Sequence, residues 1–121
     1  MNPNEKIKVL IEALPYFKKF NNKIFVIKFG GNAMMNMGQV IEDIVLLKHV
    51  GIKPIVVHGG APDIDKELNK IHIVPNFING LRYTDNTIIK IVDKVFKKTN
   101  KEIVAGITNY GKKSISLEGI I

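Results

Sequence analysis

The sequence contains no cysteine among its 121 residues, and no apolar run approaches the roughly 18 residues that a membrane-spanning helix needs. Without cysteine, disulfides and thiolate metal sites are excluded, which is typical of proteins in a reducing cytoplasm. The amino terminus also lacks the apolar core of a signal peptide. We therefore expect one cytoplasmic domain that neither crosses nor binds a membrane.

Acidic residues are outnumbered by basic ones, 11 against 18, which gives a formal net charge of +7. Such a balance favours attraction to anions: nucleic acid, nucleotides or carboxylate substrates. The lysines are spread over several segments, however, and no aromatic RNA-binding signature or arginine-rich tract interleaves with them. Solvated lysine side chains are the simpler interpretation, so we expect no nucleic-acid partner. The alternative would show an affinity that falls steeply with salt.

Hydrophobic periodicity predicts alternating helices and strands. Buried strands are expected at 23–29 and 52–58, and the β-branched run in the second suits a sheet covered on both faces. An Asn79-Gly80 pair between apolar stretches predicts a β-hairpin. A third main strand is expected at 114–117. Helices are expected at 5–20, at 39–50, from Pro62 onward, at 84–98 and at about 100–110. Pro15 removes one amide donor and should kink or interrupt the first of them.

This alternation predicts an α/β fold built on a mainly parallel sheet. The strand at 114–117 would be only the third main strand, and no helix follows it to cover the sheet. We therefore expect the architecture to be incomplete within these 121 residues. An exposed sheet edge would also favour self-association.

Two glycine turns follow consecutive strands, "KFGG" at 28–31 and "HGGAP" at 58–62. Ligands bind at the carboxyl ends of strands in such sheets, and glycines let anion oxygens reach backbone amides without a Cβ in the way. Lys28 would add a full positive charge, and a helix start after Pro62 adds an anion-binding end. A tight turn explains either pair alone, but the two together favour anion binding. Neither matches a P-loop or a dinucleotide-binding loop.

Four stretches resemble, in order, the amino-terminal half of N-acetylglutamate kinases, which belong to the amino acid kinase family: "VIKFGGNAM", "EDIVLLKHVGIKPIVVHGGAPDID", "FINGLRYTD" and "NKEIVAGITNYG". The resemblance implies a three-layer α/β sandwich with a mainly parallel central sheet. Residues 1–121 would be its truncated amino-terminal, substrate-binding domain. It also implies transfer of the ATP γ-phosphate to the side-chain carboxylate of N-acetyl-L-glutamate, in arginine biosynthesis.

The resemblance also assigns roles to single residues. Lys28 matches the catalytic lysine that stabilises the transferring phosphoryl group, and Arg82 matches the arginine that holds the substrate's α-carboxylate. Arginine suits that task because its planar fork forms two charge-assisted bonds to one carboxylate. The other matches lie in the glycine turns: Gly30, Gly31 and Gly59 for the nucleotide phosphates, and Gly60 and Ala61 for the substrate.

Ala61 departs from the family pattern, which has glycine there. If that position needs a positive φ, the Cβ adds strain of about 1 kcal/mol or more; if φ is negative, the methyl group crowds the ligand. Either way we expect weaker substrate binding than glycine would give.

The family's second half, with most of the nucleotide site, has no counterpart in residues 1–121. Because positioning and charge supply nearly all catalysis of phosphoryl transfer, little or no kinase activity is expected from this chain alone.

The resemblance implies MgATP as a co-substrate and no tightly bound cofactor. No protein metal site is expected, because the three histidines lack metal-ligand spacing. The helix within residues 1–20 resembles an oligomerisation element of arginine-sensitive members, which makes L-arginine a candidate effector and a homo-oligomer the expected state. Packing of Tyr16 and Phe17 on the domain is the alternative. For the whole chain, the alternatives are a non-catalytic module that binds N-acetylglutamate or oligomerises, and a truncated remnant.

Overall fold

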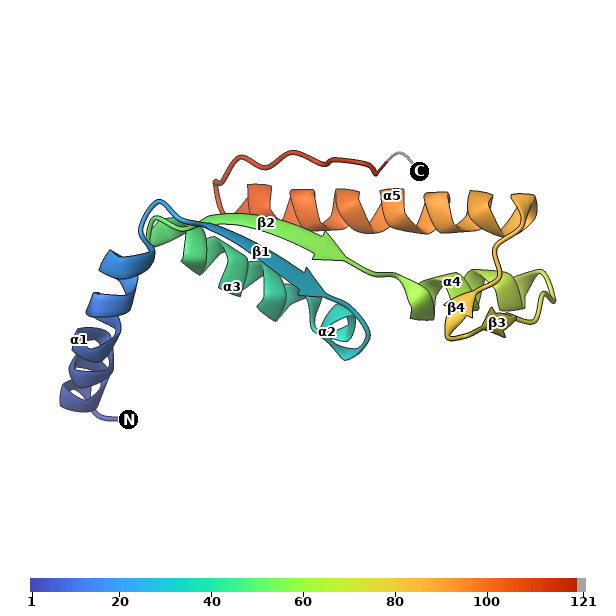
Figure 1. Ribbon diagram of the computed structural model, residues 1–121. Helices are drawn as coiled ribbons and strands as arrows, with labels where there is room; N and C mark the ends of the chain where they lie inside the picture. Colours follow the sequence, from blue (N-terminus) through green and yellow to red (C-terminus); the bar gives the residue numbers. More distant parts are fainter. Residues whose placement is uncertain (120–121) are drawn as a thin grey trace.

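The computed structural model describes residues 1–119, and the predicted alternation of helices and strands is confirmed in outline (Figure 1). The elements, in chain order, are α1 (Pro3–Phe20), β1 (Ile24–Phe29), α2 (Asn32–Met35), α3 (Met37–His49), β2 (Lys53–His58), α4 (Ala61–Lys70), β3 (Phe77–Ile78), β4 (Leu81–Arg82) and α5 (Asn86–Asn109).

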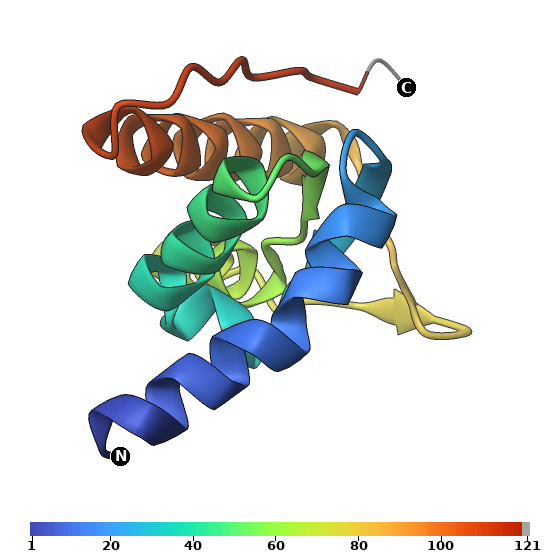
Figure 2. The same ribbon diagram turned by 90° about the vertical axis from the view of Figure 1, so that its left-hand side faces the viewer.

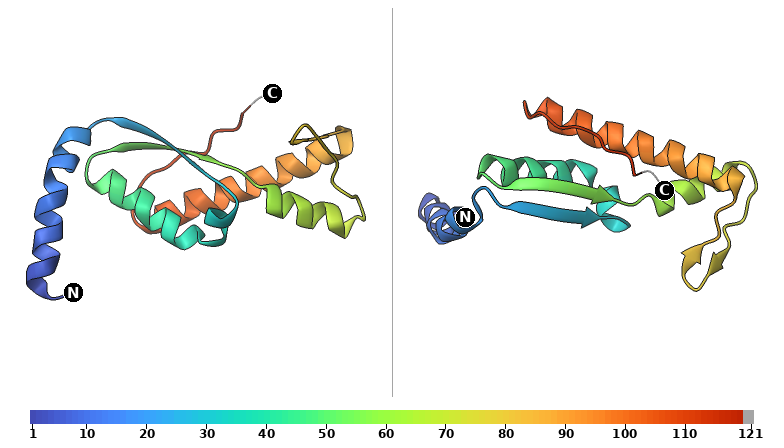
Figure 3. Two further views of the ribbon diagram at one scale, coloured as in Figure 1. Left: turned by 60° about the horizontal axis from the view of Figure 1, so that its bottom comes forward. Right: turned by 45° about the horizontal axis from the view of Figure 1, so that its top comes forward.

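β1 and β2 pair in parallel, in a register that runs from Ile24 opposite Lys53 to Phe29 opposite His58. Figure 3 shows the two arrows side by side and pointing the same way. The predicted α/β class with a parallel sheet is therefore confirmed. The carboxyl ends of both strands meet at one edge, which is the edge that positions the candidate site.

The predicted hairpin is also confirmed. β3 and β4 pair antiparallel across Asn79 and Gly80, whose φ angles are 51° and 79°. Two central residues at positive φ form the turn that matches the twist of a two-residue hairpin. The hairpin carries Arg82 toward α4.

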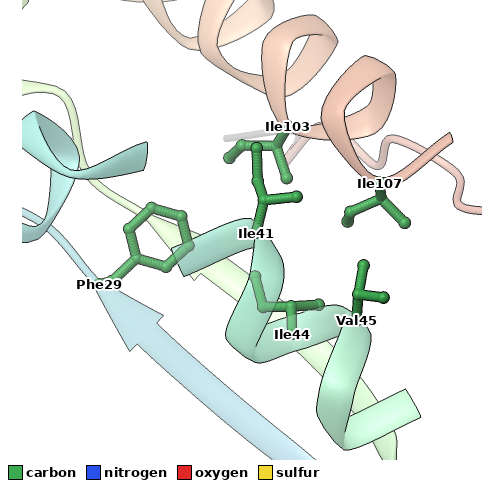
Figure 4. Close-up of a cluster of buried hydrophobic side chains, with 6 residues drawn as sticks. All are labelled: Phe29, Ile41, Ile44, Val45, Ile103 and Ile107. Atoms are coloured by element: carbon green, nitrogen blue, oxygen red, sulfur yellow. The ribbon is translucent and has the colours of Figure 1, made fainter. Parts of the chain in front are cut away.

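The core lies on one face of the parallel sheet (Figure 4). Ile41 and Ile44 of α3 lie between Phe29 of β1 and the second half of α5. α3 and α5 approach closely because Gly106 has no side chain: a Cβ there would overlap Cδ1 of Ile41. A second buried cluster joins α4 to the first half of α5, through Ile64, Leu68, Ile88 and Val95.

The other face of the sheet is exposed. Ile24 and Val26 of β1 are 63% and 68% exposed, and Ile55 and Val57 of β2 also lie open to solvent. The prediction of buried strands, with the sheet covered on both faces, is therefore wrong for residues 1–119. The physical reason is that α3 and α5 cover one face, while no described element covers the other.

α1 does not pack on the core. None of its residues is buried, and Figures 1 and 2 show it extending away from the sheet. Tyr16 is 63% exposed, so the interpretation of Tyr16 as a packing residue is wrong. Pro15 does not interrupt the helix, which continues to Phe20. At least half of each side chain is exposed along the apolar face of α1: Ile7, Leu10, Ile11 and Leu14.

Two further predictions are wrong near the carboxyl end. A single helix, α5, replaces the two predicted at 84–98 and 100–110. Thr99 and Asn100 are weak helix formers, but Thr99 is buried and Asn100 hydrogen-bonds His58, so tertiary contacts override local preference. The segment 114–117 forms no strand; it runs beside α5, where Asn100 donates to the carbonyl of Leu117.

Gly51 follows α3 at φ +90°, in the left-handed region. Replacing it with alanine is expected to lower the free energy of unfolding by about 1–2 kcal/mol, because a Cβ is disfavoured there and would overlap the side-chain amide of Asn21. Gly38→Ala is the matched control, since Gly38 lies in α3 with open space around it; it should stabilise by about 0.5–1 kcal/mol. Urea denaturation measures both, and equal effects would contradict the strain at Gly51.

Candidate anion-binding site

The two glycine turns lie side by side at the carboxyl ends of β1 and β2. The amide of Gly59 donates to the carbonyl of Phe29 at 3.0 Å. A Cβ on Gly30 would lie 3.9 Å from Cα of Gly59. The prediction that the two turns lie together at one edge of the sheet is therefore confirmed.

Three glycine amides at this edge find no backbone acceptor within residues 1–119, those of Gly30, Gly31 and Gly60. Gly31 has φ 53° and ψ −122°, a combination open mainly to glycine. Backbone amides are strong donors that are normally paired, so these three amides are available to an acceptor from outside the chain. Gly59 differs, because its amide is already donated to Phe29. Gly59 would therefore serve a ligand only through its missing side chain.

Lys28 lies on the uncovered face of the sheet, next to the last residue of β1. Successive strand residues point to opposite faces, so Lys28 and its partner Val57 face away from Phe29 and His58. The lysine side chain is exposed. Lys28 thus brings a positive charge two residues before Gly30, on a side that no described element blocks.

α4 begins directly after the second turn, with Gly60 as its N-cap and Pro62 in its first turn. No side chain caps this end of α4, which carries positive partial charge from the aligned peptides. Ala61 is the first helical residue and has no positive φ, so the strain hypothesis for Ala61 is wrong. Crowding of a ligand by its methyl group stays a prediction. Gly60 is required by packing, because a Cβ there would lie 2.9 Å from Cε1 of Phe96.

Arg82 reaches from the hairpin to α4. Its Nη2 lies 2.7 Å from Oδ1 of Asp65, its side chain is only 11% exposed, and its guanidinium lies over the ring of Phe77. The ion pair is close but poorly aligned: both Nη atoms and Asp65 Oδ1 are buried without a hydrogen-bond partner within residues 1–119. Asp65 lies one turn after Ala61 on the same side of α4. The guanidinium therefore lies beside the start of α4 with donors to spare for a carboxylate.

His58 has no role predicted from the sequence, but the structure places it next to the second glycine turn. Its Nδ1 lies 2.9 Å from the carbonyl oxygen of Gly59, and its Nε2 lies 2.8 Å from Oδ1 of Asn100. The ring packs edge-on against Phe96 of α5. No spacing pattern could have revealed this contact, because His58 and Asn100 are 42 residues apart in sequence.

Charged pairs away from the turns belong to the surface of α4 and α5. A hydrogen bond from Lys70 is the main cause that holds the pKa of Glu67 below its usual value. A hydrogen bond to Asp93 is the main cause that raises the pKa of Lys97. Glu67 is partly exposed and Lys97 is exposed, so water screens these pairs and they make only a small contribution to stability.

Within residues 1–119, no three histidine, aspartate or glutamate side chains gather as ligands of one metal ion. No helix in that range is both long and apolar enough to cross a membrane. Two cavities lie away from the glycines of the turns: one of about 440 Å³ between β2, α3, α5 and the segment 112–117, and one of about 650 Å³ between α4 and α5.

The pattern of the amino acid kinase family matches residues 23–120, most of the chain. The chain belongs to the amino acid kinase family. This amino acid kinase sequence is 55% identical over 119 residues to the acetylglutamate kinase of Carboxydothermus hydrogenoformans, and 52% identical over 118 residues to that of Petrotoga mobilis.

These alignments cover 95% and 94% of this chain but only 40% of each relative. The chain thus spans about two fifths of the length of the curated relatives that it matches. Among solved structures, N-acetylglutamate synthase from Neisseria gonorrhoeae, complexed with coenzyme A and N-acetyl-glutamate, superposes with a TM-score of 0.76. It is 22% identical, and the match covers 84% of this chain and 24% of the synthase. At that identity the likeness shows the fold alone.

Proposed function

We propose that residues 1–121 are the amino-terminal, substrate-binding domain of an acetylglutamate kinase that acts in arginine biosynthesis in the cytoplasm. The whole enzyme would transfer the γ-phosphate of ATP to the side-chain carboxylate of N-acetyl-L-glutamate. Identities of 48–55% to proteins of that name support the proposal. The structural observation that carries it is the row of glycine amides without backbone acceptors at one sheet edge.

Both anionic ligands of the proposed reaction, ATP and N-acetyl-L-glutamate, would find partners at this edge. The amides of Gly30 and Gly31, with Lys28 beside them, would receive phosphate oxygens, which need donors and positive charge. Gly60 and Ala61, at the positive end of α4, would receive the substrate. Arg82 would hold the α-carboxylate, because its fork still offers donors next to Asp65.

MgATP supplies the phosphoryl group when it is bound. Mg²⁺ is usually held by substrate phosphates and only one or two carboxylates. The residues of this chain would orient the phosphates through bare amides and neutralise developing charge through Lys28. No general base is needed, because the acceptor carboxylate is already an anion at neutral pH.

A second role is favoured by α1. Its apolar face is exposed, and a face of that kind marks a contact with another protein. We propose that residues 1–20 form an oligomerisation element. L-Arginine is a candidate effector, and one observation supports it: N-acetylglutamate synthase from Neisseria gonorrhoeae complexed with coenzyme A and L-arginine has the same fold, with a TM-score of 0.67 at 20% identity.

Calorimetric titration of the chain with N-acetyl-L-glutamate tests the proposal. We expect saturable binding of one ligand per chain. N-Acetyl-L-aspartate, which is one methylene shorter, is the matched control ligand. It should bind more weakly because its two carboxylates cannot reach Arg82 and the Gly60–Ala61 turn at the same time. A truncated remnant would bind neither ligand, and equal affinity for both would contradict a site built for N-acetyl-L-glutamate.

A further inference from the structure

The ring of His58 joins the second glycine turn to α5. Nδ1 contacts the carbonyl oxygen of Gly59 at 2.9 Å, and Nε2 contacts Oδ1 of Asn100 at 2.8 Å. Phe29 and Phe96 flank the ring, with centroid distances of 6.5 Å and 5.8 Å. The imidazole is therefore fixed on both of its nitrogens and held between two aromatic side chains.

A carbonyl oxygen only accepts hydrogen bonds, so Nδ1 of His58 must carry the proton that Gly59 receives. This assignment does not depend on the other nitrogen. On the other side of the ring, Nε2 faces Oδ1 of Asn100, whose NH₂ group donates to the carbonyl of Leu117.

The bond to Gly59 fixes the orientation of the next amide. All peptide bonds of residues 1–119 are trans, and in a trans peptide the C=O of one residue and the N–H of the next point in opposite directions. The carbonyl of Gly59 points toward His58, on the α5 side. The N–H of Gly60 therefore points away from α5, toward the face of the sheet on which Lys28 lies.

The Gly59–Gly60 peptide needs a contact that fixes its orientation, because both of the residues that it joins are glycine. Glycine takes positive and negative φ with similar ease, so the Gly59–Gly60 peptide could turn over at low cost. A reversed peptide would present the carbonyl oxygen of Gly59 to an anion and repel it. Alanine at position 60 would restrict the peptide, but packing against Phe96 excludes a Cβ there.

We propose that His58, itself held by Asn100, is a positioning residue that keeps the Gly60 amide directed at the anionic ligand. The inference rests on the proposed function, because the ligand is taken to be N-acetyl-L-glutamate. Asn100 of α5 thus helps to fix the turn between β2 and α4, because its hydrogen bond holds the ring of His58, which in turn contacts Gly59.

Three variants of His58 separate positioning from packing. His58→Phe keeps an aromatic ring between Phe29 and Phe96 but loses both hydrogen bonds. His58→Asn places an amide donor where Nδ1 lies, and His58→Gln places one where Nε2 lies. Calorimetry with N-acetyl-L-glutamate should show about tenfold weaker binding for the Phe and Gln variants, and binding within about threefold of the original for the Asn variant. If packing alone mattered, the Phe variant would bind as the original does and the Asn variant would not; that order overturns the proposal.

A ligand-free measurement keeps this test independent of the proposed function. ¹⁵N NMR of the chain should show a protonated Nδ1 on His58 and one sharp amide signal for Gly60. The Phe variant should show a doubled or broadened Gly60 signal, and the Asn variant a single one. An unprotonated Nδ1, or a Gly60 signal that is equally sharp in every folded variant, overturns the positioning role. Failure of the original chain to bind N-acetyl-L-glutamate would instead overturn the proposed function and leave the NMR result as the test of His58.

Discussion

Lys28→Met is expected to lower phosphoryl transfer to N-acetyl-L-glutamate by a factor of about one hundred or more. Removing one group that stabilises transition-state charge typically costs 10²–10³ in turnover, and charge stabilisation dominates this kind of chemistry. Methionine keeps a flexible side chain of similar length on the uncovered face, so the fold should persist. Affinity for N-acetyl-L-glutamate should change little, because the proposed substrate contacts lie at Gly60, Ala61 and Arg82.

The assay needs an assembly that turns over. The chain should be mixed with the part of the Carboxydothermus hydrogenoformans acetylglutamate kinase that it does not span, and kcat and KM measured for the mixture. The chain alone is expected to show little or no turnover. Lys23→Met is the matched control: it removes the same charge just before β1, at the opposite end of the strand, and should leave kcat unchanged. Equal losses in both variants would show a general charge effect and contradict the role of Lys28.

Arg82→Lys is expected to weaken binding of N-acetyl-L-glutamate by about tenfold to a hundredfold. Hydrogen bonds to charged groups contribute about 1.5–3 kcal/mol, and each 1.4 kcal/mol changes affinity tenfold. Lysine keeps the charge but loses the planar fork that binds a carboxylate at two points. It also loses the contact of the guanidinium with the ring of Phe77.

The control for Arg82 is Lys66→Gln. Lys66 lies on α4 like Asp65, pairs with Asp63 and is 73% exposed, so its loss removes one charge near the site without touching the proposed subsite. Calorimetry should show affinity within about twofold of the original for this variant. Chemical denaturation of Arg82→Lys shows whether the variant is still folded, and so distinguishes lost binding from lost structure. A stable variant with unchanged affinity for N-acetyl-L-glutamate would rule out Arg82 as the carboxylate partner.

The arrangement of the two glycine turns and of the hairpin could be predicted, because it depends on local sequence patterns. Gly-Gly pairs after two consecutive strands can only meet if those strands are parallel neighbours, and β-branched runs separated by a helix predict that arrangement. The Asn79-Gly80 turn fixes the hairpin register, which carries Arg82 toward α4. The two turns and the hairpin depend on residues close together in sequence, so periodicity and turn chemistry were sufficient to predict them. The role of Arg82 is implied only by the family resemblance.

Long-range contacts could not be predicted in this way. The His58–Asn100 bond joins residues on two elements that the sequence alone does not place against each other. The same bond, with the burial of Thr99, keeps α5 continuous where weak helix formers predicted a break. The uncovered sheet face was missed because apolar β-branched residues look alike whether or not another layer covers them.

We propose above all that one sheet edge, formed by two glycine turns, binds the anionic groups of the ligand. The most direct test is residue-resolved: ¹⁵N NMR of the chain titrated with N-acetyl-L-glutamate and then with a Mg²⁺–ATP analogue. We expect the signals of Gly60, Ala61 and the Arg82 side chain to shift together with one dissociation constant, and those of Gly30 and Gly31 to respond to the nucleotide. Shifts confined to the lysines of α5 or to α1, with the glycine turns unmoved at saturation, would contradict it.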